Sequence, residues 1–229
     1  MKSTLRLSII VPVYNESRTI VTIVRTLHEI FPDNVELIFV DDGSTDDSLR
    51  ILRQEMREGD IVLTKENGGK GSAVRFGITK ATAPFTVIQD ADLEYDPREI
   101  LTLLHYAEEH PGTIVFGSRF LKKNPNIYKR NYIGNRLITL ILDLLFLGTL
   151  TDSYTCYKLF PTAILKSLPL HAQGFELEAE LSAWPLKLGI HIHELPITYR
   201  PRSLEEGKKI RAVDAWRGFC TMLAIRFRR

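Results

Sequence analysis

Short apolar runs alternate with amphipathic stretches through the first half of the chain. Runs rich in β-branched residues, each ended by a polar turn, predict strands at residues 5–13, 35–42, 61–65, 84–90 and 113–118. Apolar residues at helical spacing predict helices between them, at residues 17–31, 44–56, 69–81 and 97–110. Ser44 or Thr45 is expected to cap the second helix. This alternation predicts an α/β fold with a mostly parallel central sheet and helices on both faces.

A polar motif follows each of the five predicted strands, and these motifs are PVYNE, DDGSTD, NGGKG, DADLE and GSR. In open parallel sheets, ligands bind outside the carboxyl ends of the strands. Five motifs at five strand ends therefore indicate a binding site more strongly than any one of them does.

The most acidic of these motifs is DADLE. Asp90 and Asp92 are two residues apart in extended chain, so both carboxylates can face one point above the sheet. Mg²⁺ or Mn²⁺ held together with substrate phosphates would offset their repulsion, with Glu94 as a candidate third ligand. The alternative is an acidic loop, because DxD is a common tripeptide. Asp96 is interpreted as a cap of the next helix.

Other polar residues carry weaker signals. Asp41 ends a buried strand and is well placed to accept hydrogen bonds from a base or ribose. The NGGKG turn can cradle phosphate at a helix start, with Lys70 adding charge, although a solvated surface lysine is the alternative. Neither a P-loop nor a dinucleotide fingerprint is present. His191 and His193 are interpreted as a solvated strand face rather than a metal site.

Charge is unevenly distributed along the 229 residues, although the net charge is only +2. Residues 118–136 hold six basic side chains and no acidic one, so the second half offers an anion-binding field. The basic regions lack a recognisable nucleic-acid motif, which argues against a nucleic-acid partner. Two cysteines without metal-type spacing indicate reduced cytosolic thiols.

Two apolar segments in the second half are typical of a membrane surface and equally of helices packed on protein. Residues 137–150 are apolar but too short to span a bilayer. The C-terminal segment ends in arginines and carries one helical stripe of Val213, Trp216, Phe219, Cys220, Leu223 and Phe227.

In these motifs and their order, the chain resembles glycosyltransferase family 2, in particular its polyprenyl/dolichyl-phosphate sugar synthase branch. The segments that carry the resemblance cover nearly the whole chain and are VPVYNE (11–16), DDGSTD (41–46), NGGKGSAVRFG (67–77), DADLE (90–94), GSR (117–119), TDSYTCYKLF (151–160), GFELEAEL (174–181) and ELPITYRPRSLEEGKKI (194–210). The resemblance implies a GT-A fold. It further implies one continuous domain in which residues 1–120 bind a nucleotide sugar and residues 121–229 bind the acceptor.

The resemblance also implies roles for individual residues. The nucleoside pocket is expected to be lined by Pro12, Tyr14, Glu16 and Asp41. The metal that bridges the donor diphosphate is expected at Asp90 and Asp92, with Glu94 where relatives often have Gln. Phosphate contacts are expected from Arg119 and Arg202, joined by Arg130 or Arg136. Asp152 is expected to orient the acceptor or sugar, with a turn residue as the alternative.

Together these expectations describe a metal-dependent, inverting glycosyltransferase. It would move a hexose from GDP-mannose or UDP-glucose to a polyprenyl or dolichyl phosphate, as a peripheral enzyme on the cytosolic face of a membrane. The alternative is a soluble family 2 enzyme that acts on a glycan, protein or small molecule and uses Asp152 as an essential base. A binding module without turnover is disfavoured because both DxD carboxylates are present. The sequence is compatible with either donor and with any oligomeric state.

Overall fold

A computed structural model describes residues 5–31, 33–124, 129–201 and 212–228 of the chain. Its strands are β1 (Leu7–Val13), β2 (Val35–Asp41), β3 (Ile61–Thr64), β4 (Phe85–Ile88), β5 (Ile114–Ser118), β6 (Lys158–Pro161) and β7 (Ile192–Pro196). Its helices are α1 (Ile20–Ile30), α2 (Ser48–Glu55), α3 (Lys70–Lys80), α4 (Glu99–Glu109), α5 (Lys129–Phe146), α6 (Thr162–Ser167), α7 (Leu177–Lys187) and α8 (Ala212–Phe227).

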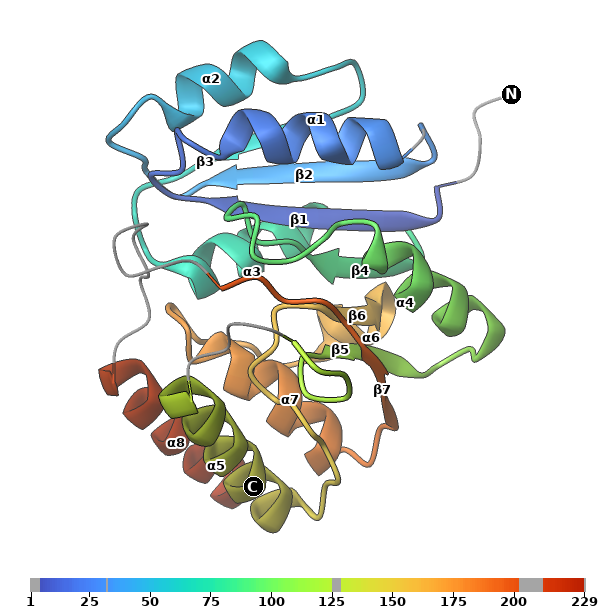
Figure 1. Cartoon of the computed structure of the whole chain (residues 1–229), viewed down its shortest axis with the longest axis vertical. Helices are drawn as coiled ribbons and strands as arrows, with labels where there is room; N and C mark the ends of the chain where they lie inside the picture. The colour runs from blue at the N-terminus through green and yellow to red at the C-terminus, as the bar shows by residue number, and fades with distance from the viewer. Residues whose placement is uncertain (1–4, 32, 125–128, 202–211, 229) are drawn as a thin grey trace.

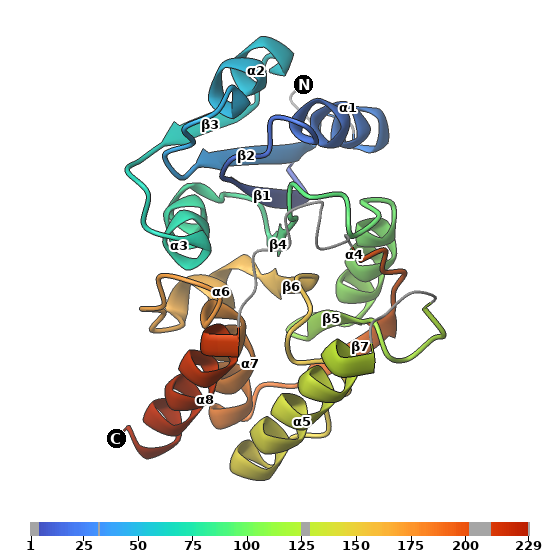
Figure 2. The same cartoon turned by 60° about the vertical axis from the view of Figure 1, so that its left-hand side comes forward.

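The strands form one sheet in the order β3-β2-β1-β4-β6-β5-β7 (Figure 1). All neighbouring strands pair in parallel except β6, which runs antiparallel to both β4 and β5. Helices α3 and α6 cover one face of the sheet, and α1 and α4 cover the other (Figure 2). The predicted α/β class with a mostly parallel sheet is confirmed, and the five predicted strands end at one edge.

The centre of the sheet is buried on both faces, as its sequence requires. Every position of β2 is buried, and in β1 only Pro12 is half-buried. Continuous apolar runs such as LSIIVPV are typical of strands covered on both faces by helices. This rigid centre holds the loops that follow β1, β2 and β4 in fixed positions.

One local prediction is wrong, and a second holds for only one of two histidines. Helix α2 begins at Ser48, so Ser44 and Thr45 do not cap it, and both instead bond to Asn15 of the PVYNE loop. The strand predicted around the two histidines is present as β7. His191 is exposed as expected, but His193 is half-buried and stacks on the Tyr106 ring, with 4.2 Å between centroids. In both cases a contact between distant segments overrides the local pattern.

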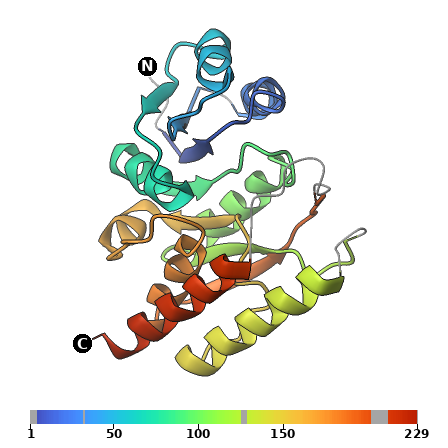
Figure 3. The ribbon, with the colours of Figure 1, turned by 90° about the vertical axis from the view of Figure 1, so that its left-hand side faces the viewer.

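Helices α5 and α8 lie side by side at the end of the molecule opposite α1 and α2 (Figures 1 and 3). On α8, Met222 and Ile225 pack inward, while the large apolar side chains that remain exposed on the two helices are Tyr132, Ile133, Leu137, Leu140, Leu144, Val213, Trp216 and Phe227. The predicted C-terminal stripe therefore faces largely outward. Within the described residues, none of the helices has the length and apolar character needed to cross a bilayer.

Candidate active site

The loops after β1 and β2 are fastened to each other at the predicted nucleoside pocket. The backbone N–H of Asn15 donates to Ser44 Oγ at 3.1 Å, and the N–H of Glu16 donates to Ser48 Oγ at 2.7 Å. Pro12 is half-buried at the end of β1, and the Tyr14 ring is 38% exposed beside it. The loop that the family resemblance assigned to the nucleoside is thereby bonded to the loop that follows β2.

Asp41, the last residue of β2, presents a buried acceptor atom beside these loops. Its side chain is buried, and Oδ2 accepts from the N–H of Ser44 at 3.2 Å. Its Oδ1 is also buried and has no hydrogen-bond partner among the described residues. A buried carboxylate oxygen without a partner costs free energy, so a ligand that donates to it would be favoured. A base N–H or a ribose hydroxyl has this chemistry.

The neighbouring Asp42 fixes the glycine-rich turn. Its Oδ1 accepts from Gly68 N–H at 3.1 Å and its Oδ2 accepts from Gly69 N–H at 2.7 Å, while Lys65 Nζ lies 2.6 Å from Oδ1. Gly69 has φ +90°, and a Cβ there would lie 2.6 Å from the carbonyl oxygen of Gln173. Only glycine fits this position. Sequence reasoning assigned Asp41 to the ligand but missed that Asp42 builds the turn.

Lys70, the first residue of α3, points at the end of β4. Its Nζ lies 2.8 Å from Asp90 Oδ1 and 3.1 Å from Glu178 Oε1. Lys158 on β6 lies behind it, with Nζ 2.5 Å from Glu178 Oε2. Burial lowers the pKa of Lys70, but the Asp90 and Glu178 carboxylates outweigh this and hold that pKa well above its usual range. Lys70 is therefore not a solvated surface lysine.

The DADLE loop places its carboxylates differently from a closed metal cage. Asp92 Oδ1 accepts from the N–H of Glu94 at 3.1 Å, and Glu94 Oε2 accepts from the Tyr199 hydroxyl at 2.7 Å. Among the described residues, no group of three or more His, Cys, Asp or Glu side chains is arranged to hold a metal. Glu94 as a third ligand stays a prediction.

The oxygen ligands that the chain does offer fit one kind of metal site. Mg²⁺ is usually held by one or two carboxylates and completed by substrate phosphates and water, not by protein ligands alone. Asp90 and Asp92 supply two hard carboxylates just after β4, and a diphosphate would also balance the charge of Lys70, which lies beside Asp90. The pair therefore fits a divalent ion shared with a diphosphate.

A second charged pair lies at the end of β5. Arg119 Nε lies 2.7 Å from Asp152 Oδ2, and Nη2 lies 2.7 Å from Oδ1, so the contact is bidentate and buried. Burial lowers the pKa of Arg119, but Asp152 outweighs this and raises it well above its usual value. The guanidinium carbon also lies 5.0 Å from the Tyr199 ring. Asp152 is thus engaged with Arg119.

Glu194 of β7 fixes the segment that carries Asp152. Glu194 Oε2 accepts from Thr151 N–H at 2.6 Å, and Oε1 accepts from Asp152 N–H at 2.9 Å. Arg136 Nη1 on α5 donates to the Thr151 carbonyl at 2.7 Å. Two side chains lie outside the described part of the chain: Arg202, which was predicted to contact phosphates, and Arg130, which was the alternative to Arg136 in that role.

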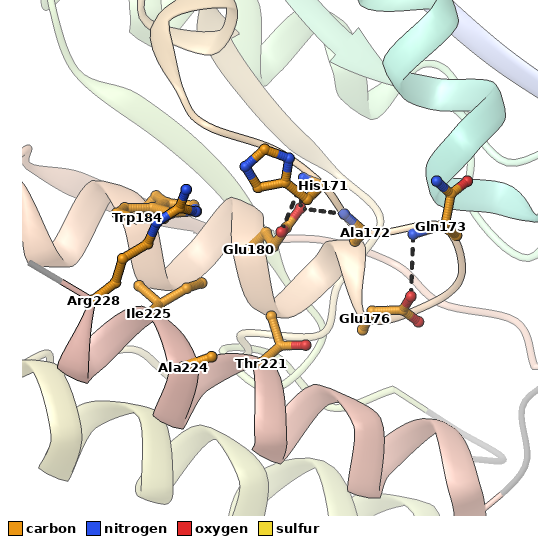
Figure 4. A pocket seen from close by; sticks show the side chains of 10 residues that line it. All are labelled: His171, Ala172, Gln173, Glu176, Glu180, Trp184, Thr221, Ala224, Ile225 and Arg228. Carbon is orange, nitrogen blue, oxygen red and sulfur yellow. Dashed lines mark hydrogen bonds between the residues drawn. The ribbon is translucent and has the colours of Figure 1, made fainter.

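A pocket of about 330 Å³ lies between α7 and α8, and its lining includes none of the predicted site residues that the structure describes (Figure 4). Its wall includes the segment before α7, where Glu180 accepts from His171 and Ala172 N–H groups. The carbonyl of Gln173, which also lines it, accepts from Ser72 N–H at the start of α3. The strand-end residues are not part of this pocket; many of their side chains pair with one another.

Comparison with known proteins identifies the family. Residues 8–168 match the family model described as glycosyl transferase family 2. The chain belongs to this family. The two curated relatives described next are glycosyltransferases by their names, and the family to which this chain belongs is one of glycosyl transferases.

Individual relatives of this glycosyltransferase are distant. It is 29% identical to Glycosyltransferase AglJ of Haloferax volcanii over 85% of this chain and 63% of that protein. It is 27% identical to the dolichyl-phosphate beta-glucosyltransferase of Saccharomyces cerevisiae, over 91% of this chain and 70% of that protein. The chain thus spans 63% of the first of these relatives, and only 60% of a third, the dodecaprenyl-phosphate galacturonate synthase of Rhizobium johnstonii, to which it is 29% identical.

A solved structure confirms the expected GT-A fold. Glucosyl-3-phosphoglycerate synthase from Mycobacterium tuberculosis, in complex with Mn²⁺, UDP and phosphoglyceric acid, matches with a TM-score of 0.76 and 22% sequence identity. The match covers 99% of this glycosyltransferase and 80% of that chain. At this identity the likeness concerns the fold.

Proposed function

We propose that this glycosyltransferase moves a hexose from a nucleoside diphosphate sugar to a polyprenyl-type lipid phosphate at a membrane surface. The observation that carries the proposal is the link between the charged site and an apolar helix. Thr139 of α5 bonds to Ser153 beside Asp152, with 2.9 Å between the two hydroxyl oxygens. The exposed apolar row of α5 is therefore attached to the segment that holds Arg119.

The donor would bind along the ends of β1, β2 and β4. Asp41 Oδ1, buried and without a described partner, would accept a hydrogen bond from the nucleoside. Lys70 and a divalent ion at Asp90 and Asp92 would face the diphosphate. Such an ion, when bound, stabilises the negative charge that develops on the leaving nucleoside diphosphate.

The acceptor phosphate would approach from the side of Arg119 and Arg136. A phosphate ester is already anionic at neutral pH, so its oxygen can attack the anomeric carbon without a strong base. The new bond joins that oxygen to the anomeric carbon as the bond to the diphosphate breaks on the opposite face, which inverts the configuration. Asp152 would position the Arg119 fork, because both of its oxygens are bonded to that side chain.

The membrane contact would be made by α5 and α8. Exposed Leu140, Leu144 and Trp216 provide an apolar surface, and Arg217 and Arg226 are exposed on α8. Apolar side chains bordered by arginines are typical of helices that lie in the interface of an anionic bilayer. The yeast relative, by its name, acts on dolichyl phosphate, a membrane lipid. This supports a lipid acceptor for this chain.

The test is a transfer assay with purified protein, a short polyprenyl phosphate, Mn²⁺ or Mg²⁺, and a panel of nucleotide sugars. The glycolipid is detected by mass spectrometry. We expect product from one donor, a loss of at least about 100-fold in Asp92→Ala, and near-normal activity in the matched control Asp96→Ala, whose carboxylate accepts from Arg98 N–H just before α4 and does not cap that helix.

Other outcomes have defined meanings. Metal-dependent donor hydrolysis without glycolipid would retain the donor site and overturn the lipid acceptor. Soluble phosphate esters and glycans would then be the acceptors to test. Absence of both transfer and hydrolysis with every donor would overturn the proposed reaction.

A further inference from the structure

Four charged side chains from four elements meet behind the DADLE motif. They are Lys70 of α3, Asp90 after β4, Lys158 of β6 and Glu178 of α7. Two are cations and two are anions, so the cluster is neutral in the ion-free protein. Lys158 is wholly buried and Glu178 is nearly so, which makes the inner pair a fixed part of the interior.

The inner pair determines where Lys70 can lie. Lys158 donates to both Oε2 and the backbone carbonyl of Glu178, at 2.5 Å and 3.0 Å. This leaves Glu178 Oε1 directed at Lys70, 3.1 Å away. Lys70 is thus held between Glu178 and Asp90, and its ammonium is the cation that neutralises Asp90.

A divalent ion that approached Asp90 alone would meet this ammonium. The two cations would repel each other strongly, because the site is partly buried and poorly screened by solvent. A nucleoside diphosphate would offset this repulsion, since its oxygens can pair with the metal and with Lys70 at the same time. The metal and the donor should therefore each favour the binding of the other.

We propose that Lys70, positioned by Glu178 and Lys158, is a resident counter-ion of Asp90 that makes metal binding depend on the nucleoside diphosphate. The inference rests on the proposed function, because it takes Asp90 and Asp92 as the metal ligands. It assigns Lys70 a role beyond phosphate contact: it disfavours metal in the empty site. By linkage, the metal must raise nucleotide affinity by the same factor.

The test measures Mn²⁺ affinity from the electron paramagnetic resonance signal of free Mn²⁺, without nucleotide and with saturating UDP or GDP. In the wild type, nucleotide should tighten Mn²⁺ binding by at least about tenfold. In Lys70→Met, nucleotide-free Mn²⁺ binding should become tighter by on the order of tenfold, and the effect of nucleotide should shrink. Lys70→Arg should keep the dependence on nucleotide.

A matched control is Lys122→Met, which removes a lysine–carboxylate pair with Glu99 at the surface. It should leave both Mn²⁺ constants unchanged. Equal Mn²⁺ affinity with and without either nucleotide, or unchanged constants in Lys70→Met, would overturn the inference while the metal site stands. Absence of Mn²⁺ binding under all conditions, in the wild type as in Asp92→Ala, would overturn the metal site and the inference together.

Discussion

The carboxylate of Asp152 is wholly buried and bonded through both oxygens to Arg119. A general base must have a lone pair directed at the proton it removes. An aspartate that is held in a fork with arginine instead fixes the arginine in one orientation. At the scale of the single residue, this geometry favours positioning over proton transfer.

Replacing Asp152 by Asn tests that role. Asn accepts only one of the two guanidinium bonds and leaves the Arg119 charge uncompensated, which should cost roughly 3–5 kcal/mol of stability. The rate of transfer should fall by about 100-fold at every pH from 6 to 9, because the arginine loses its orientation. Urea unfolding and pH–rate profiles measure the two effects, with nucleotide binding as the check on folding.

The matched control for that experiment is Asp143→Asn, at the end of α5, where the carboxylate accepts from Leu150 N–H. This variant should transfer sugar at nearly the wild-type rate. If the wild type showed an acidic limb in its pH–rate profile and Asp152→Asn left only a low rate independent of pH, Asp152 would be a base and the positioning role would be wrong.

Asp46 provides a pH-dependent contribution to stability. Its carboxylate accepts from Ser48 N–H at 2.9 Å and from Ser17 N–H at 3.2 Å. Burial raises the pKa of Asp46, but the hydrogen bonds from Ser48 and Ser17 outweigh this and lower that pKa from 3.8 to about 2. The unfolded chain therefore binds the proton more readily, and the stabilisation is present above pH 3.8 and lost as pH falls towards 2.

Asp46→Asn should lower the free energy of unfolding by about 1 kcal/mol or less at neutral pH, because one hydrogen bond is lost. The difference from the wild type should shrink as the pH is lowered through 3.8. Urea unfolding at several pH values measures it. Asp47→Asn, an exposed neighbour paired only with Arg50 among the described contacts, should change stability by less than about 0.5 kcal/mol. If the difference in the free energy of unfolding between Asp46→Asn and the wild type grew on acidification, the lowered pKa of Asp46 would be contradicted.

At the scale of the element, helix α8 packs against the segment that carries Asp152. A glycine of α8, Gly218, makes this close contact possible. A Cβ at Gly218 would overlap the Tyr154 hydroxyl, which is buried and without a hydrogen-bond partner among the described residues. The absence of a side chain at this turn of α8 is what lets Tyr154 pack against the helix. The position of α8 and that of the site segment are thereby coupled.

Gly218→Ala should destabilise the protein by roughly 1–3 kcal/mol through overpacking, despite the better helix propensity of alanine. Adding Tyr154→Phe should restore most of the loss, since the hydroxyl is the overlapping group. The control is Gly134→Ala on α5, where an added Cβ meets nothing within 4 Å. That change should stabilise by up to about 1 kcal/mol. If Gly218→Ala and Gly134→Ala changed the thermal stability equally, the close packing of Tyr154 against α8 would be refuted.

At the scale of the whole molecule, the exposed apolar helices and the proposed nucleoside end lie apart. Helices α5 and α8 are at one end in Figures 1 and 3, and α1 and α2 are at the other. Docking through α5 and α8 would leave the donor-binding loops open to the aqueous phase. A soluble nucleotide sugar and a membrane lipid could then reach one site from different sides.

The double substitution Leu140→Glu with Leu144→Glu should abolish sedimentation with vesicles that contain anionic lipid. The two side chains are 54% and 72% exposed, so the change should alter stability by no more than about 1 kcal/mol. Leu101→Glu is a matched control, because Leu101 is 45% exposed on α4, away from these helices. Vesicle binding that survives in the double variant would show that another surface meets the membrane.

Local pattern predicted the five parallel strands and the helices between them, because each has its own apolar periodicity. It missed β6, whose four residues include the buried Lys158 and show no alternation. That strand forms because β4 and β5 supply its hydrogen bonds. Motifs likewise indicated Lys70 and Asp152, but their partners Glu178 and Arg119 come from distant segments, and no local rule pairs them.

The antiparallel strand β6 has a consequence for how the chain is made. In the described sheet, β5 pairs with β6 and β7 and with no strand that precedes it. A nascent chain that has emerged only as far as β5 therefore holds an edge strand with nothing to pair with, and β4 lacks its outer neighbour. The first half cannot complete its fold on the ribosome before β6 emerges. Nor should the first half be exchangeable between proteins as a module, because its sheet closes only with strands from the second.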